Sequence, residues 1–293
     1  MSRVKLHILQ CALAVAIALP GLAQGPPPGA PGPARSGKQG ALADFTGYWV
    51  SLVTEDWRYR MMTPAKGDVN GLPITAEARK VADAWDPAKD EAAGESCKAY
   101  GAPGIMRRPT RLHITWQDDN TLKIETDEGT QTRLLHFNAT APASEAPSLQ
   151  GYSAAIWQGA GPGGGGNRGN GNGGGLVAAP AGPPAGVGTG AGAAPAAGAG
   201  RGGPPAPAGP GSMKVVTTKL KPGYFRTNGV PYGANATLTE YFTKVSDPTG
   251  ETFLVLTSAL EDPLYIRGEY LSSTHFLKEP DGAKWDPSPC HAK

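Results

Sequence analysis

Three histidines lie in stretches that have the composition of β-strands: His113, His136 and His275. Imidazoles that converge from three strands could hold zinc, iron or the edge of a haem. The spacing does not support such a site, because the chain contains no His-x-His and no His-Glu-x-x-His. His113 also alternates with Leu112 and Ile114, which directs it outward if those two are buried. We therefore expect no metal ion and no cofactor.

The nucleophiles and carboxylates are equally unspecific. A hydrolase needs a nucleophile beside a base and an orienting group, but the chain has no Gly-x-Ser-x-Gly, and neighbours in the run from Ser272 to His275 point to opposite faces of a strand. No pair among four acidic residues has a spacing that indicates a glycosidase: Glu55, Glu240, Glu261 and Asp262. We expect no catalytic residue. A hydrolase-type enzyme with Glu55, His136 or His275 as acid or base stays as an alternative.

One stretch places rings and charges together. Residues 44–62 read DFTGYWVSLVTEDWRYRMM, which begins as an apolar strand and continues with four charged residues. Alternate residues of a strand share a face. If the strand continues, Trp49, Trp57 and Tyr59 face inward together with Glu55.

An inward carboxylate needs partners, because an unpaired buried charge is costly. We expect Glu55 to pair with an inward Arg such as Arg111 or Arg133, or to lie in a wet barrel mouth. In the functional alternative it is the polar anchor of a ligand site. Three charged residues fall on the opposite face and are expected to form a surface ion network: Asp56, Arg58 and Arg60.

Strand signals dominate the rest of the chain. Nine short runs are enriched in β-branched or aromatic residues, from GYWVSLV to EYLSSTHFL, with turn sequences such as Asn228-Gly229 between them. We predict a mainly β fold, an antiparallel up-and-down barrel of about eight or nine strands, since closure removes exposed edges. A sandwich is the other option. One helix is predicted from Thr75 to Trp85, with Thr75 as its N-cap.

The opening Gly47-Tyr48-Trp49 resembles the first-strand motif of lipocalins, and Thr239-Glu240-Tyr241 is similar to a later motif of that family. The family also packs an Arg across the Trp, where the nearest cations here are Lys278 and Arg267. Phrases such as EDWRYRM, CKAYGAPGIMRRP and PGYFRTNGVPY look like an uncharacterised family of exported bacterial proteins. These resemblances imply export and a lipocalin-like or calycin-like barrel, without an established activity.

The composition divides the chain. Residues 1–23 have the charged start, apolar run and small-residue end of a signal peptide, and residues 24–43 form a Pro/Gly spacer that is expected to be disordered. Residues 44–293 are expected to form one domain, interrupted by a disordered Gly/Ala/Pro insertion at 159–211. The apolar run is too short to span a bilayer, so we expect an exported protein, periplasmic or secreted.

Cys97 and Cys290 are left after removal of the signal peptide and are expected to form a disulfide in an oxidising compartment. The net charge of +2, with both signs intermixed, excludes nucleic acid and anionic membranes as expected partners.

The leading hypothesis is an exported, non-enzymatic barrel that binds a small, partly apolar molecule in its lumen. An envelope-associated module, tethered to a cell-envelope partner by residues 159–211, is the alternative. Eight residues are expected to line the ligand site: Trp49, Glu55, Trp57, Tyr59, Trp116, His136, Glu240 and His275.

Overall fold

A computed structural model describes residues 35–159 and 211–292. The predicted signal peptide, most of the Pro/Gly spacer and nearly all of the Gly/Ala/Pro insertion lie outside the described residues. Within the described part, no helix is long and apolar enough to cross a membrane.

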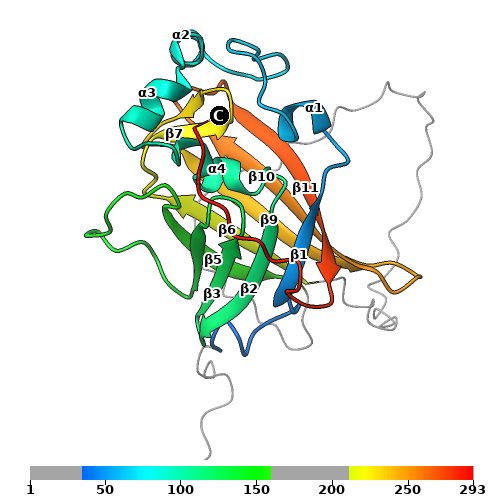
Figure 1. The fold of residues 1–293 in the computed structure, drawn as a ribbon. Coiled ribbons are helices and arrows are strands. Elements are labelled where there is room, and N and C mark those ends of the chain that lie inside the picture. Colours follow the sequence, from blue (N-terminus) through cyan, green and yellow to red (C-terminus); the bar gives the residue numbers. More distant parts are fainter. Residues whose placement is uncertain (1–34, 160–210, 293) are drawn as a thin grey trace, which may run out of the picture. The chain divides into compact units, whose positions relative to one another are not determined.

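Nine strands of the described chain close into a barrel, as predicted (Figure 1). Around the barrel they follow the order β1-β11-β10-β9-β6-β5-β4-β3-β2. Their bounds are β1 Gly47–Leu52, β2 Arg111–Asp118, β3 Thr121–Thr126, β4 Thr132–Phe137, β5 Tyr152–Gln158, β6 Ser212–Thr218, β9 Thr237–Ser246, β10 Thr252–Glu261 and β11 Glu269–Glu279.

One pair of neighbours departs from the predicted antiparallel pattern. β4 and β5 pair in parallel, with Leu135 opposite Ser153. A closed ring that alternates strand direction needs an even number of strands, so a ring of nine contains at least one parallel pair. The connection of residues 138–151 therefore returns the chain from one end of the barrel to the other. We call the end where β1 begins the floor and the opposite end the cap.

Side chains of alternate strand positions fill the interior of the barrel. Trp49 is fully buried and belongs to one apolar cluster with residues from all nine strands, the segment before β1 and the cap. The large members of this cluster include Phe45, Tyr100, Ile124, Leu135, Phe137, Phe242, Leu254 and Phe276. Trp49 and Trp116, two of the residues predicted to line a lumen, therefore lie in or against a packed core.

The floor explains the Gly-x-Trp opening. The indole Nε1 of Trp49 donates to the carbonyl oxygen of Phe45 at 2.8 Å. The Lys278 ammonium lies 4.6 Å from the centre of the indole ring, so Lys278 takes the position expected for a cation across the Trp. Burial lowers the pKa of this lysine. Gly47 has a φ of 103°, and a Cβ there would lie 2.9 Å from the Lys278 ammonium.

Short helices and a hairpin gather at the cap (Figure 1). The elements are α1 Trp57–Arg60, α2 Ala76–Ala84, α3 Pro87–Ala92, η1 Lys98–Tyr100, α4 Ala102–Ile105, β7 Gly223–Arg226 and β8 Val230–Tyr232. The predicted helix is α2, and the Oγ1 of Thr75 accepts from the amide of Ala78 at 3.2 Å, as expected of an N-cap. The other helices were not predicted, because runs of three to six residues have no helical periodicity to detect.

The predicted disulfide is present between Cys97 and Cys290. Cys97 precedes η1 in the cap, and Cys290 belongs to the C-terminal segment after β11. The bond thus holds the end of the described chain against the cap.

Candidate anion site in the barrel cap

The eight residues predicted to share a lumen lie at different places. Trp49 and Trp116 are part of the interior, where Trp116 packs 5.4 Å from the ring of Phe137. Trp57 is exposed to 63% on α1, and Tyr59 lies in the cap. His136 and His275 belong to strand positions that alternate with buried neighbours and face outward.

The opening strand ends sooner than its composition indicates. β1 stops at Leu52, and Asp56 adopts a left-handed backbone with a φ of 51° before α1 begins. The two-residue alternation therefore does not apply from Glu55 to Arg60. Arg60, predicted to point outward into a surface ion network, is instead buried under the cap.

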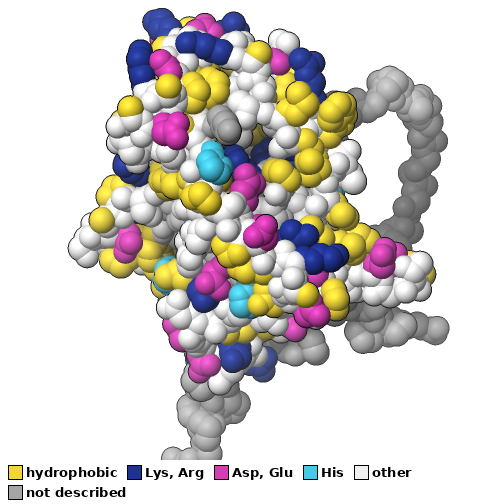
Figure 2. Space-filling view, viewed as in Figure 1, with side chains coloured by type: hydrophobic (Ala, Val, Ile, Leu, Met, Phe, Trp, Pro, Cys, Tyr) yellow, Lys and Arg dark blue, Asp and Glu magenta, His cyan; other side chains and the backbone are white. Residues whose placement is uncertain are grey.

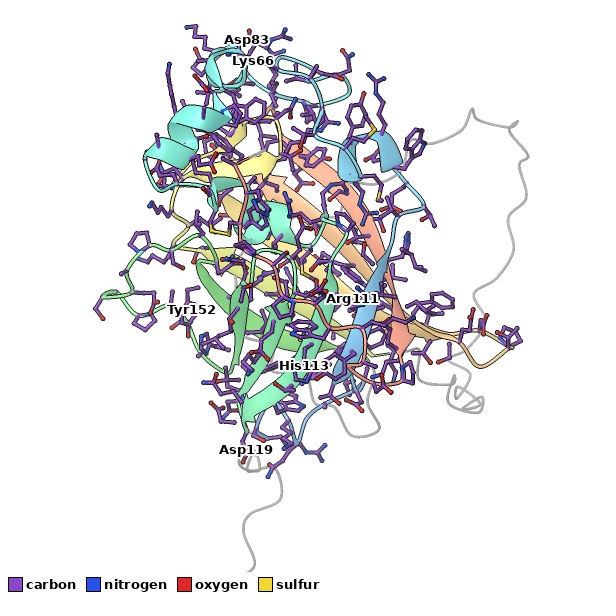
Figure 3. All side chains as sticks on the ribbon, viewed as in Figure 1. Lys66, Asp83, Arg111, His113, Asp119 and Tyr152 are labelled. Atoms are coloured by element: carbon purple, nitrogen blue, oxygen red, sulfur yellow. A yellow bond between two sulfur atoms is a disulfide. The ribbon has the colours of Figure 1, made fainter. Side chains whose placement is uncertain are left out.

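Glu55 has partners other than those predicted. It forms an ion pair with Arg60, and its Oε2 accepts from the hydroxyl of Thr54 at 2.7 Å and lies 3.3 Å from the Nδ1 of His275. Arg111 pairs with Glu279 at 3.1 Å and lies on the barrel wall below the cap (Figure 3). Two of the predicted site residues, Glu55 and His275, do meet, at the outer wall of the barrel.

Glu240 pairs with the other predicted partner. Arg133 donates from Nη1 and Nη2 to the two carboxylate oxygens of Glu240 at 3.1 and 2.6 Å, and both side chains are 1% exposed. The hydroxyl of Thr217 lies 3.4 Å from the same guanidinium and 2.8 Å from the hydroxyl of Ser153. This polar cluster lies inside the barrel along four neighbouring strands, and the Nε of Arg133 is buried without a hydrogen bond to the described residues.

The histidines do not converge. His113 stacks on Tyr48 at 4.2 Å, and His136 stacks on Tyr152 at 4.7 Å. Figure 3 shows His113 and Tyr152 on separate parts of the barrel wall. The described residues contain no group of three or more His, Cys, Asp or Glu that could hold a metal ion.

Arginines converge instead in the cap. A small cleft that opens to solvent lies between α1, the η1–α4 segment and the end of β7, and it encloses about 20 Å³. We call it the arginine cleft. Its lining residues are Tyr59, Arg60, Ala99, Gly104, Arg107, Arg108, Phe225, Arg226 and Thr227.

Several donors at the arginine cleft lack partners. The Nη1 atoms of Arg107 and Arg108 and the Oγ1 of Thr227 are buried without a hydrogen bond to the described residues. A buried donor that stays unsatisfied costs about 1–3 kcal/mol, and more if it is charged. An acceptor that enters the cleft would remove this cost.

Three of the four guanidinium groups have carboxylate partners away from the cleft lining. Arg60 pairs with Glu55, Arg107 with Asp56 at 2.8 Å, and Arg108 with Glu128, to which its Nε donates at 3.0 Å. These pairs hold the groups in place and compensate three charges.

Arg226 is different. Its guanidinium lies 3.8 Å from the centre of the Tyr59 ring, and its Nη1 lies 3.5 Å from the carbonyl oxygen of Asp68. Among the described residues, no carboxylate lies within ion-pair distance of it. Burial lowers the pKa of Arg226, and burial also lowers that of Arg60. Both shifts mean that the positive charges in this cleft are poorly solvated and would gain from an anion.

The disulfide-linked segments hold one wall of the cleft in place. The Tyr100 hydroxyl accepts from the Nη2 of Arg108 at 2.9 Å and from the amide of His291, next to Cys290, at 3.2 Å. The Arg108 guanidinium lies 3.9 Å from the centre of the Tyr100 ring. The linked segments therefore fix the direction of Arg108.

The lining of the cleft contains no Asp, Glu or His, and its charged side chains are all arginines. Sequence patterns did not predict that these arginines meet, because they belong to three separate segments of the chain. The one available signal is that EDWRYRM, CKAYGAPGIMRRP and PGYFRTNGVPY each combine an aromatic residue with arginine.

Comparisons with protein-family models, with curated proteins and with solved structures give no match for this chain. The closed barrel of the described residues is consistent with a lipocalin-like architecture. The site is therefore interpreted from its own geometry.

Proposed function

We propose that this protein is a non-enzymatic binding protein for a small organic anion and that the anion binds in the arginine cleft. The observation that carries this proposal is the convergence of four guanidinium groups around free space, with the Nη1 atoms of Arg107 and Arg108 left without acceptors. Charge-assisted hydrogen bonds from guanidinium groups are the usual means of holding carboxylate and phosphate.

The ligand site is thus moved from the lumen to the cap. The interior positions are occupied by packed side chains and by the buried ion pair of Arg133 and Glu240. The arginine cleft keeps the partly apolar character of the original hypothesis, because Phe225 and the ring of Tyr59 form part of its wall.

We also propose that the protein is exported and that it belongs with the uncharacterised exported proteins it resembles. The Cys97–Cys290 disulfide supports export, because such bonds persist in oxidising compartments. The tether hypothesis concerns residues that lie outside the described part, and no observation favours it.

The test is to measure the binding of formate, acetate, benzoate and inorganic phosphate in chloride-free buffer by ligand-observed NMR and by calorimetry. Arg107→Gln and Arg226→Gln each remove one guanidinium from the cleft. We expect each to weaken binding about tenfold or more, since a hydrogen bond to a charged group contributes about 1.5–3 kcal/mol. The matched control is Arg79→Gln, which removes an arginine from the exposed surface of α2.

Binding that is unchanged in both cleft variants, or binding of none of the four anions, would refute the proposal. Circular dichroism and the melting temperature of each variant establish that the fold is kept.

A further inference from the structure

A group of exposed apolar side chains lies on and directly after α1, the helical turn that also lines the arginine cleft. Trp57, Met61 and Met62 are exposed to 63%, 56% and 60%. We call these three residues the apolar rim. Single exposed apolar residues are common, but three large ones within six positions form a patch of the kind that marks an interaction site.

The apolar rim and the cleft share one element. α1 is a single turn, so its outer and inner sides lie within about 10–12 Å of each other. Tyr59 and Arg60 line the cleft from this turn. Trp57 and Met61 are four residues apart and lie on one face of it. A ligand that leaves the cleft past α1 meets the apolar rim.

The charges of the cleft favour a monoanion. Three of its arginines pair with Glu55, Asp56 and Glu128, and Asp68, which pairs with Arg58, is near enough to oppose the lowering of the Arg226 pKa by burial. These five arginines and four carboxylates leave one positive charge. One carboxylate matches one uncompensated guanidinium. The enclosed part of the cleft also has room only for a small group, because it measures about 20 Å³.

We propose that the arginine cleft and the apolar rim together bind the C-terminal end of a partner polypeptide, with its α-carboxylate in the cleft and its last apolar side chains on the rim. This inference rests on the proposed function. Capture of a terminal carboxylate is a known mode of peptide recognition.

Because the apolar rim is exposed to solvent, a polypeptide is a better ligand for it than a lone hydrocarbon chain. An alkyl chain on an open surface keeps its outer side in water, whereas a partner protein covers the rim from that side and buries both surfaces. Trp, Met and Arg are also the residues enriched at protein interfaces, and Met adapts its shape to different partners.

The experiment is calorimetry of the full chain with hexapeptides. One peptide ends in two apolar residues with a free carboxylate, a second is its C-terminal amide, and a third ends in two polar residues with a free carboxylate. Acetate and decanoate are the small probes. The rim variant combines Trp57→Ser, Met61→Gln and Met62→Gln. Its matched control is Leu271→Gln, which removes a side chain exposed to 64% on the wall of the barrel.

We expect the free apolar peptide to bind at least tenfold more tightly than its amide and than the polar peptide. The rim variant should lose that preference and keep the affinity for acetate, and Leu271→Gln should change neither.

Three results would overturn the inference: equal affinity for the apolar and polar peptides, a rim variant that binds the apolar peptide normally, or decanoate that binds more tightly than the peptide. Acetate binding that depends on Arg107 would leave the proposed function standing in each case. Failure of every carboxylate to bind would refute both.

Discussion

At the scale of single residues, the pair of Arg133 and Glu240 is the clearest case in which stability depends on both partners. Both side chains lie inside the barrel and are 1% exposed, so that neither charge has access to water. A buried ion pair is weak evidence for stability as a whole, but loss of one partner leaves an uncompensated charge.

Glu240→Gln is therefore expected to lower the free energy of unfolding by about 3–5 kcal/mol, as measured by urea denaturation. The double variant Arg133→Met with Glu240→Leu should recover most of that loss, because it removes both charges. Glu251→Gln, at an exposed position, is the control. A single variant as stable as the parent protein would show that water reaches the pair.

Tyr224 connects stability to alkaline pH. Burial and the nearby Asp90 carboxylate raise the pKa of Tyr224 to about 12, and its hydroxyl donates to Asp90 at 3.0 Å. The unfolded value is about 10. A raised folded pKa contributes stability that is complete below pH 10 and is lost as the pH rises towards 12. Lys98 acts in the same direction, because its bonds to Asp90 and Glu95 outweigh its burial and raise its pKa.

We accordingly expect the melting temperature to fall between pH 10 and 12, and to fall less steeply in Tyr224→Phe than in the parent protein. Tyr241→Phe, on the outer wall, should follow the parent curve. Parallel curves for Tyr224→Phe and the parent would contradict this account.

At the scale of elements, the sequence predicted the regular pieces and missed the irregular ones. The barrel strands and α2 follow from periodicity and capping. α1 could not be predicted, because WRYR also fits a strand and no local pattern indicates that β1 stops at Leu52 or that Asp56 is left-handed. The parallel pairing of β4 and β5 follows from the closed ring of nine, which no local pattern encodes.

Gly47 marks the point where the floor needs glycine. Gly47→Ala should lower the free energy of unfolding by about 1–3 kcal/mol, because its φ of 103° is strained for any other residue. Gly250→Ala is the matched control, since its φ of 93° is also positive but nothing lies within 4 Å of the added Cβ.

Denaturation curves of the two glycine variants separate backbone strain from crowding by Lys278. The Gly47 variant should be the less stable of the two. Equal losses would mean that the Lys278 side chain moves aside without cost.

At the scale of the whole molecule, the disulfide joins distant parts of the chain and supports the candidate site. Cys97→Ser with Cys290→Ser should cost about 2–5 kcal/mol of stability. It should also weaken benzoate binding, because the His291 amide then no longer fixes Tyr100 and Arg108. Thermal unfolding and calorimetry check the two effects. Reduction of the parent protein should reproduce both, and unchanged benzoate affinity would separate the disulfide from the site.

The candidate site shows why a site formed by distant segments is not predicted from sequence patterns. Arg60, Arg107 and Arg226 are far apart in the chain and meet only after the barrel has closed. The surface does not indicate these arginines either, because acidic and basic side chains are intermixed on the face that Figure 2 shows. The lumen hypothesis assumed a hollow barrel, and strand patterns alone do not distinguish a hollow interior from a packed one.

The pairing of β5 with β6 at the floor has a practical consequence. Gln158 lies opposite Ser212, and the Cα of Gly211 is 3.5 Å from where a Cβ of Gly159 would be. The chain thus leaves and rejoins the barrel at one point, at the end opposite the arginine cleft. The entropic cost of closing a loop depends only weakly on its length. This point is therefore suited to the insertion of a fluorescent reporter, which would leave the cap free to bind its ligand.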